Sequence, residues 1–363
     1  MKINLLKLMH GCCAPDAGTL VNTTQNYVNA YDGSTTAFAS PNDLSSLMKT
    51  YYDTELLENA RPNLIHAQFA RKQPLPKGRG KKVEWRKFNT LADASALTEG
   101  VIPTGQKFGQ SSMTASILQY GTYLTVSDQL ELHAIDNVIL SATEELGASA
   151  GTTQDKLVRD TLAAGTNVQY CDKVSTAGAH TAVTTRAGMD TTSKLTPTEV
   201  NKAVTTLKKL KAPTINGKYV AIIHPSVSYD LRENKEWIEA HKYAAVTPLF
   251  TGEIGELHGV RFIETTEAKI WNNNTCPVKT QSGSATYYSV YSTLFLGKDA
   301  FGMIDPEGGG LEMIVKSKEQ AGGPLNQFST LGYKFSTATK ILYQDRMVRV
   351  ESLSEYSGTD EAN

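Results

Sequence analysis

Hydrophobic and polar positions divide this chain into a polar leading segment and several periodic segments. Residues 1–40 are rich in Asn, Thr, Gly and Ser and carry no sustained hydrophobic period, which predicts an extended arm. Ser40-Pro41-Asn42-Asp43 is typical of a helix start, because Ser or Asn can cap a first turn that contains proline. Apolar residues then recur at helical spacing until Arg61-Pro62, where the helix is expected to end or bend. Residues 1–60 therefore predict an arm followed by one helix.

Two strand-like segments follow. The first ends a basic stretch at residues 71–89 and is marked by Val83, Trp85 and Phe88; the second runs over 113–126. The stretch between them is polar and contains glycine, so residues 61–130 predict a long β-hairpin. A two-stranded ribbon buries little apolar surface and is marginal on its own in water. The hairpin is therefore expected to lie on another surface.

The longest helical pattern covers residues 136–165. Its apolar stripe consists of Val138, Ile139, Ala142, Leu146, Ala150, Leu157, Val158 and Leu162. Gly165 is a typical residue just after a helix C-terminus. At 1.5 Å per residue this helix would be about 40 Å long. Residues 332–353 read as strand material, and we expect that segment to pack against the helix despite the distance in sequence.

A mixed α/β pattern occupies residues 196–320. Thr196, Pro197 and Glu199 match a capping box with proline in the first turn, which predicts a helix start. Residues 219–224 form a compact apolar run that predicts a buried strand. A further helix is expected over 227–243, strands at 259–264, 286–296 and 311–316, and a loop or irregular insertion over 172–195.

Composition places the chain among ordinary globular proteins. Hydrophobic residues make up 40% and charged residues 20%, and 363 residues exceed what one compact core usually serves, so two or more subdomains are expected. Four cysteines form no disulfide framework, which favours synthesis in a reducing cytoplasm. No apolar run approaches the length of a membrane span, so no membrane contact is expected.

Charge is unevenly distributed. Lys plus Arg number 36 and Asp plus Glu 37, giving a formal net charge of -1. A protein that coats nucleic acid usually has a basic excess, so any contact with double-stranded DNA should be local, weak and non-specific. Residues 71–87 are nevertheless strongly basic, and residues 128–145 supply acids. Such opposite patches are suited to self-association, although a solvated basic face is the alternative interpretation.

One stretch resembles a phosphate-binding loop. Residues 100–107 contain Gly100, Gly105 and Lys107, but Gln106 separates the second glycine from the lysine and Pro103 removes one backbone donor. The region therefore favours a turn-rich hairpin tip over a nucleotide site. We find no nucleophile elbow and no histidine or cysteine spacing typical of zinc, so no catalytic residue, cofactor or metal is predicted. A nucleotide-binding hydrolase of mixed α/β fold remains the alternative function.

The order of these elements resembles the Hong Kong 97-like fold of tailed-bacteriophage major capsid proteins, and the local sequence resembles the N-four podovirus-type capsid family. The stretches that carry the resemblance are Leu97-Thr98-Glu99-Gly100-Val101-Ile102-Pro103, Gln119-Tyr120-Gly121 with Ser127-Asp128, His224-Pro225, Ala321-Gly322-Gly323-Pro324-Leu325-Asn326-Gln327, Gly332-Tyr333-Lys334 and Ile341-Leu342-Tyr343. Together they span residues 55–353 approximately, and their order and spacing carry the match.

The resemblance implies an α+β capsid fold with an N-terminal arm and first helix at 1–60 and an E-loop hairpin at 61–130. It also implies a peripheral domain with a long spine helix at 131–195 and 321–363, and an axial domain at 196–320. It implies a virion shell protein, assembled in the host bacterial cytoplasm, that forms hexamers and pentamers around double-stranded DNA. Its other partners would be a portal and scaffold or decoration proteins. The residues expected to contact a neighbouring subunit are Arg79, Lys81, Lys82, Trp85, Arg86, Phe108, Tyr120, Glu131, Asp136, Glu144 and Glu145.

Overall fold

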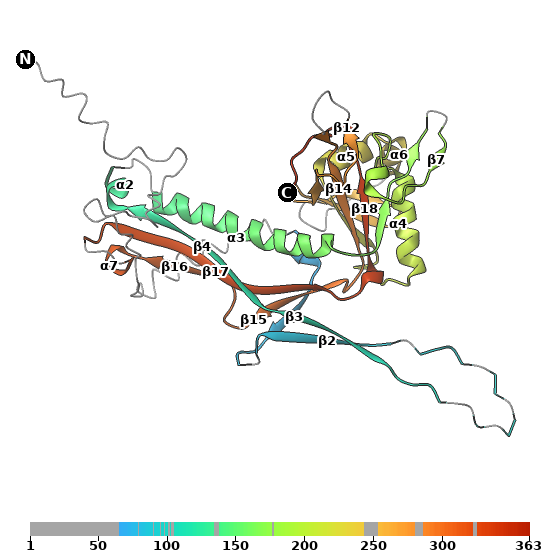
Figure 1. Ribbon diagram of the computed structural model, residues 1–363, viewed down its shortest axis with the longest axis horizontal. Helices are drawn as coiled ribbons and strands as arrows, with labels where there is room; N and C mark the ends of the chain where they lie inside the picture. Colours follow the sequence, from blue (N-terminus) through green and yellow to red (C-terminus); the bar gives the residue numbers. More distant parts are fainter. Residues whose placement is uncertain are drawn as a thin grey trace, which may run out of the picture. The chain divides into compact units, whose positions relative to one another are not determined.

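The computed structural model describes residues 65–363 apart from 79, 90, 95, 98, 101, 103–104, 134–137, 176–177, 243–252, 280–285 and 322–324, and without the side chains of 131, 133, 138, 141, 240–242 and 253. The arm and helix predicted for residues 1–60 lie outside the described residues. The described part combines helices and sheets, as the predicted α+β class requires (Figure 1). It divides into two compact units. The described residues of the first are Gln119–Thr152 and Gly309–Ser336, and the second unit holds the rest.

The first unit is a small antiparallel sheet with helices. Its elements are β4 (Leu118–Ser127), α2 (Asp128–His133), the first half of α3 (Val138–Ala163), β16 (Glu312–Lys316), α7 (Lys318–Ala321) and the first part of β17 (Phe328–Ile341). Strand β17 pairs with both β16 and β4. A Cβ atom on Gly121 would lie 2.5 Å from the carbonyl oxygen of Tyr333, and one on Gly332 would lie 2.8 Å from the Cβ of Tyr123. Only glycine permits this close approach of β4 and β17.

The long helix α3 was predicted over 136–165 and spans Val138–Ala163. In the first unit, Ser149 Oγ on this helix lies 3.2 Å from the hydroxyl oxygen of Tyr333. In the second unit, Val158 and Leu162 are buried in a cluster that contains Met347. The predicted packing of the helix against residues 332–353 is therefore confirmed within each unit.

Residues 332–353 are not one sheet segment, however, and this part of the prediction is wrong. Strand β17 ends at Ile341, and β18 (Met347–Ser352) belongs to a different sheet. A short 3-10 turn, η6 (Gln344–Arg346), separates the two strands. The alternating apolar pattern continues across the turn, so periodicity alone does not reveal the change of sheet.

The main sheet of the second unit has the strand order β5-β18-β14-β8-β10-β9, with β11 beside β14. These strands are β5 (Val168–Tyr170), β8 (Tyr219–Ile223), β9 (Glu253–Leu257), β10 (Val260–Glu264), β11 (Ile270–Trp271), β14 (Val290–Leu296) and β18. Every residue of β8, β14 and β18 is buried. The strand predicted at 219–224 is therefore confirmed as the centre of this core, and the strands predicted at 259–264 and 286–296 correspond to β10 and, for the most part, β14.

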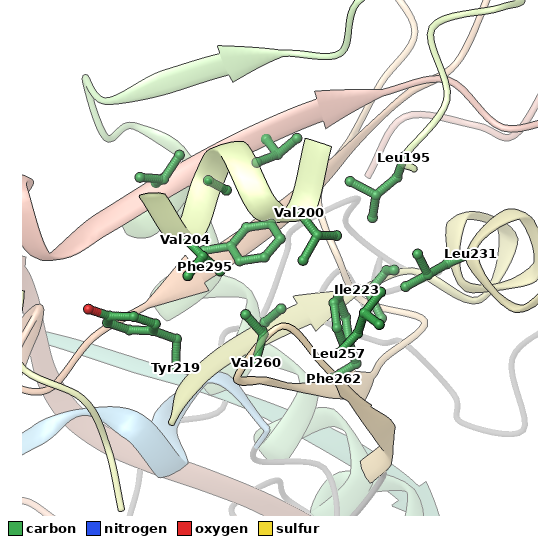
Figure 2. Close-up of a cluster of buried hydrophobic side chains, with 14 of the residues drawn as sticks. Leu195, Val200, Val204, Tyr219, Ile223, Leu231, Leu257, Val260, Phe262 and Phe295 are labelled. Atoms are coloured by element: carbon green, nitrogen blue, oxygen red, sulfur yellow. The ribbon is translucent and has the colours of Figure 1, made fainter. Parts of the chain in front are cut away.

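Helix α4 (Pro197–Lys209) covers this sheet. Thr196 caps it by accepting a hydrogen bond from the backbone N–H of Glu199, as the capping box predicted. In Figure 2, Val200 and Val204 of α4 lie among the buried side chains of the sheet, which include Phe295. Pro197 occupies the first turn, where its missing N–H costs no helical hydrogen bond.

The single helix predicted over 227–243 is two helices, α5 (Pro225–Arg232) and α6 (Lys235–Lys242). The break has a local cause. The Asn234 side chain accepts a hydrogen bond from the backbone N–H of Glu236 at 3.1 Å, so it caps a new helix start. Helical periodicity continues through the break and conceals it.

Several short elements complete the second unit. They are η4 (His66–Phe69), β1 (Arg71–Leu75), β6 (Lys173–Val174), β7 (His180–Thr181), η5 (Arg186–Gly188), β12 (Val278–Lys279), β13 (Thr286–Tyr287) and β15 (Phe301–Pro306). Strand β1 pairs in parallel with β15, which pairs with the end of β17. The region 172–195, predicted as a loop, thus contains the small β6–β7 pair and η5. No helix among the described residues has an apolar stretch long enough to cross a membrane.

Candidate functional site

The predicted hairpin is present as β2 (Lys82–Phe88) and β3 (Gln110–Ser116), which run antiparallel with Phe88 opposite Gln110 (Figure 1). The second strand, expected over 113–126, is instead two strands, β3 and β4. The break lies at Ile117, whose N–H donates to the carbonyl oxygen of Lys81 at 2.9 Å. At this residue the chain leaves β2, and β4 then pairs with β17.

We call the paired segments 81–87 and 111–117 the hairpin root. One face of this root is part of the subunit's own core. Val83 and Trp85 alternate with exposed residues along β2, and both pack in a cluster with Ile304 and Leu342. The Trp85 indole N–H donates to Gln73 Oε1 at 2.8 Å, and only 9% of this residue is exposed. The root is therefore held firmly by the second unit, and Trp85 has little free surface.

The other face of the root is polar and mainly basic. Lys82, Glu84 and Arg86 alternate outward along β2. On β3 they face Ser116, Thr114 and Ser112, which have short hydroxyl side chains. Arg86 Nε lies 3.5 Å from Glu84 Oε1, a loose pair with both side chains largely exposed. Lys81 is exposed as well. The outward face thus presents more positive charge than its one acid offsets.

Beyond the root, the hairpin carries apolar side chains that remain exposed beside the described part of the subunit. The rings of Phe88 and Phe108 stack with centroids 4.7 Å apart, yet they remain 59% and 64% exposed. Leu91, Leu97 and Ile102 are also exposed, and Ile102 reaches 93%. We call these five residues the apolar tip. Large exposed apolar side chains on one hairpin, two of them stacked on each other, make it a candidate interaction site.

The remaining residues predicted to contact a neighbouring subunit are placed as follows. Tyr120 lies in the first unit, half-buried, with its ring centroid 5.7 Å from that of Phe335. Glu144 and Glu145 are exposed on α3 in the same unit. Arg79, Asp136 and the side chain of Glu131 lie outside the described residues. Phe108 belongs to the apolar tip, whereas Lys81, Lys82, Trp85 and Arg86 form the hairpin root. Their contacts with another subunit stay a prediction.

Four members of the apolar tip, namely Phe88, Leu91, Leu97 and Ile102, were not among the contact residues predicted from the sequence. Leu91, Leu97 and Ile102 lie in a polar stretch and fit no periodic pattern, whereas Phe88 served only to mark the predicted strand. The available signal is the presence of large apolar residues in a predicted hairpin tip, where no core of the same subunit is expected to reach them.

The loop that resembles a phosphate site has a different geometry. Lys107 is exposed, and the chain passes from it into β3 rather than into a helix. A phosphate loop relies on backbone N–H groups at a helix start. The hydrolase alternative therefore gains no support from this region.

A buried ion-pair network elsewhere in the second unit connects elements of its fold. Arg186 donates from Nε and Nη2 to the two carboxylate oxygens of Glu351 at 2.6 and 2.8 Å. Glu351 is completely buried, and the Arg186 guanidinium lies 3.8 Å from the ring centroid of Trp271. This bidentate pair joins η5 to β18 and compensates the charge of the buried carboxylate.

Comparison with known proteins agrees with this geometry. The family described as phage capsid protein matches residues 35–322. The capsid protein of Ralstonia phage GP4 is similar in fold, with a TM-score of 0.56 at 13% identity over 79% of this chain and 87% of that chain. The capsid protein of cyanophage Pam1 has a TM-score of 0.56 at 12% identity, over 91% and 99% of the two chains. The capsid protein of Helicobacter pylori bacteriophage KHP30 has a TM-score of 0.54 at 11% identity, over 78% of this chain and 87% of that chain. No curated protein matches significantly.

Proposed function

The chain belongs to the phage capsid protein family and is a phage major capsid protein with the Hong Kong 97-like fold, and we propose that its β2–β3 hairpin lies across an adjacent subunit of the shell. The observation that carries the proposal is the apolar tip. Phe88 and Phe108 stack on each other but remain more than half exposed, which supports a contact in which a neighbouring subunit covers them. The root, anchored through Trp85, would hold the hairpin in a fixed direction for that contact.

Apolar burial would supply most of the free energy of this contact. Removing apolar surface from water contributes roughly 25 cal/mol per Å². Covering a few hundred Å² of the apolar tip would therefore contribute several kcal/mol for each subunit. The contact is repeated around the shell, so even a modest contribution at each hairpin stabilises the assembly.

The basic outward face of the root would supply orientation. We propose that Lys81, Lys82 and Arg86, with Arg79, approach acids of the neighbour. The candidate acids are Glu131, Asp136, Glu144 and Glu145 on the segment that includes α2 and the start of α3. An exposed pair contributes only about 0–1 kcal/mol, so these charges guide the docking more than they hold it.

The wider assembly follows from the family. We propose hexamers and pentamers in an icosahedral shell around double-stranded DNA, assembled in the host cytoplasm, with a portal and scaffold or decoration proteins as further partners. In this assignment 61–130 is the E-loop, 131–195 with 321–363 the peripheral domain and 196–320 the axial domain. The net charge of -1 agrees with weak, local DNA contact.

A hairpin-shortened variant tests the proposal. Residues 89–109 would be replaced by Asn-Gly, which suits a two-residue turn between the paired residues Phe88 and Gln110. The root, with Trp85 in its core, stays intact, so the thermal unfolding of the subunit should be nearly unchanged. Shell formation, followed by light scattering and sedimentation, should be lost. A folded, shortened subunit that assembles with normal yield would contradict the proposal.

A further inference from the structure

Three side chains of the second unit, far from the hairpin, converge beside α4. Asp172 precedes β6, His180 lies on β7, and Glu199 lies in the first turn of α4. One ligand atom from each of the three lies within 4.8 Å of the other two. Ligands around a zinc ion with bonds of about 2.1 Å lie about 3.4 Å apart, so only a small approach separates this arrangement from a metal site.

Two of the three groups are largely buried, and the third is exposed. Glu199 is 3% exposed and accepts a hydrogen bond from Gln169 Nε2 at 2.9 Å. Asp172 is 13% exposed. His180 is exposed and lies at the end of the short β6–β7 pair, where its imidazole can turn without disturbing a core. The site thus combines two largely buried carboxylates with one exposed imidazole.

The cation now beside the carboxylates is the ammonium group of Lys202. It lies 2.8 Å from Glu199 Oε1 and also pairs with Asp172. One ammonium offsets only one of the two carboxylates, so with a neutral imidazole the group retains a net charge of -1. The Lys202 side chain is 43% exposed and lines an open hollow of about 540 Å³ together with Thr198 and Lys209. A displaced ammonium group therefore has room to move into solvent.

We propose that Asp172, His180 and Glu199 bind a divalent transition-metal cation, with Zn²⁺ as the reference ion, in place of the Lys202 ammonium. One imidazole and two carboxylates suit a metal that accepts nitrogen and oxygen ligands. Ca²⁺ and Mg²⁺ prefer six or more oxygens, which these residues do not supply. Three protein ligands would leave one position of a tetrahedral ion for water or another ligand. Bound metal would tie the β6–β7 pair to α4 and stabilise this part of the subunit.

The experiment uses the full-length subunit before assembly. Calorimetry should detect saturable uptake of Zn²⁺, and Zn²⁺ should raise the melting temperature whereas Mg²⁺ should not. His180→Ala and Asp172→Asn should each weaken Zn²⁺ binding by about 100-fold, the upper range for loss of a group that supports a metal. The matched control is His258→Asn, which removes another exposed histidine at a turn where asparagine tolerates the positive φ of 53°.

Lys202→Met gives the opposing test. It removes the competing charge but keeps the apolar stem, so Zn²⁺ binding should tighten about tenfold. Without metal this variant should melt at a lower temperature, because both carboxylates lose their partner, and Zn²⁺ should restore the loss. The proposal is overturned if Lys202→Met weakens Zn²⁺ binding, if Zn²⁺ does not restore its stability, or if His258→Asn abolishes uptake as fully as His180→Ala.

Discussion

His66 and Asp155 form a completely buried pair between the start of the described chain and the helix α3. His66 Nδ1 lies 2.6 Å from Asp155 Oδ2, and the backbone N–H of His66 donates to Asp155 Oδ1 at 2.8 Å. The side chains are 0% and 1% exposed. Both oxygens of one carboxylate therefore fix the segment that leads directly into β1 and the hairpin.

Asp155→Ala should destabilise the subunit by about 2–6 kcal/mol, because it leaves two buried donors without an acceptor and each such loss costs about 1–3 kcal/mol. Urea unfolding of the isolated subunit measures the difference in free energy of unfolding. Glu144→Ala, on an exposed position of the same helix, is the matched control and should change stability by less than about 0.5 kcal/mol. Equal effects of the two substitutions would show that the buried pair contributes nothing.

Trp85 and Phe108 should separate stability from assembly. Trp85→Ala empties part of the core beneath the hairpin root and should cost about 3–5 kcal/mol in the free energy of unfolding. Phe108→Ala removes an exposed ring and should leave that free energy nearly unchanged while lowering shell yield. Trp85→Ala should also harm assembly more than Lys81→Ala, since it releases the hairpin from its anchor. Urea unfolding and sedimentation of both variants test this separation, which fails if Phe108→Ala assembles normally.

The elements that local chemistry determines were predicted correctly from the sequence. Thr196 and Glu199 form a cap that depends on residues three positions apart, and the run at 219–224 is apolar enough to be a central strand whatever surrounds it. The hairpin root was also accessible, because Val83 and Trp85 alternate with charged residues along one strand. In each case the sequence signal lies within a few residues of the chain.

The sequence did not reveal the elements whose structure depends on residues far away along the chain. Strand β1 was missed because Pro74 and the basic residues around it argue against a strand, and among the described residues it pairs with the remote β15. As an edge strand it can include a proline. The metal site proposed beside α4 could not be predicted for the same reason, because Asp172, His180 and Glu199 show no metal-binding spacing along the sequence and converge only in the fold.

Stability should fall as the pH drops below neutrality, and His224 should contribute. Its ring caps α5 by accepting a hydrogen bond from the N–H of Ser226 and lies 5.0 Å from the ring of Tyr291. Burial lowers the pKa of His224, although the charges of Asp360 and Glu264 act in the opposite direction. A histidine whose pKa is lowered on folding contributes stability above its unfolded pKa of about 6.5, and this is lost as the pH falls below that value.

His224→Asn provides the check, because asparagine can keep the cap while removing the titrating ring. The free energy of unfolding would be compared between pH 7.5 and pH 5 for both proteins. We expect the free energy of unfolding to fall less between the two pH values for the variant. The pKa of Asp360 is also lowered: burial alone would raise it, but hydrogen bonds from Ser357 and Tyr291 outweigh that effect. Its contribution is lost only at lower pH, near the ordinary range of an aspartate. If the free energy of unfolding falls as much between pH 7.5 and pH 5 in the variant as in the unmodified protein, His224 is excluded as a cause of the pH dependence.

Reversing the charge of Lys81 and Lys82 together should slow shell assembly, and the effect should depend on salt. Both side chains are exposed, so the double change to glutamate should leave the stability of the subunit nearly unaltered. If the basic face of the root guides docking onto acids of a neighbour, the reversal turns attraction into repulsion. The Debye length shrinks from about 30 Å at 0.01 M salt to about 10 Å at 0.1 M, so the defect should be largest at low salt and fade as salt rises. The rate of light-scattering increase across a salt series measures this.

Reversing Glu144 and Glu145 to lysine in the same chain should restore part of the rate, because opposite charges would then meet again. A defect independent of salt, or no recovery in the quadruple variant, would exclude these acids as the partners of the basic face.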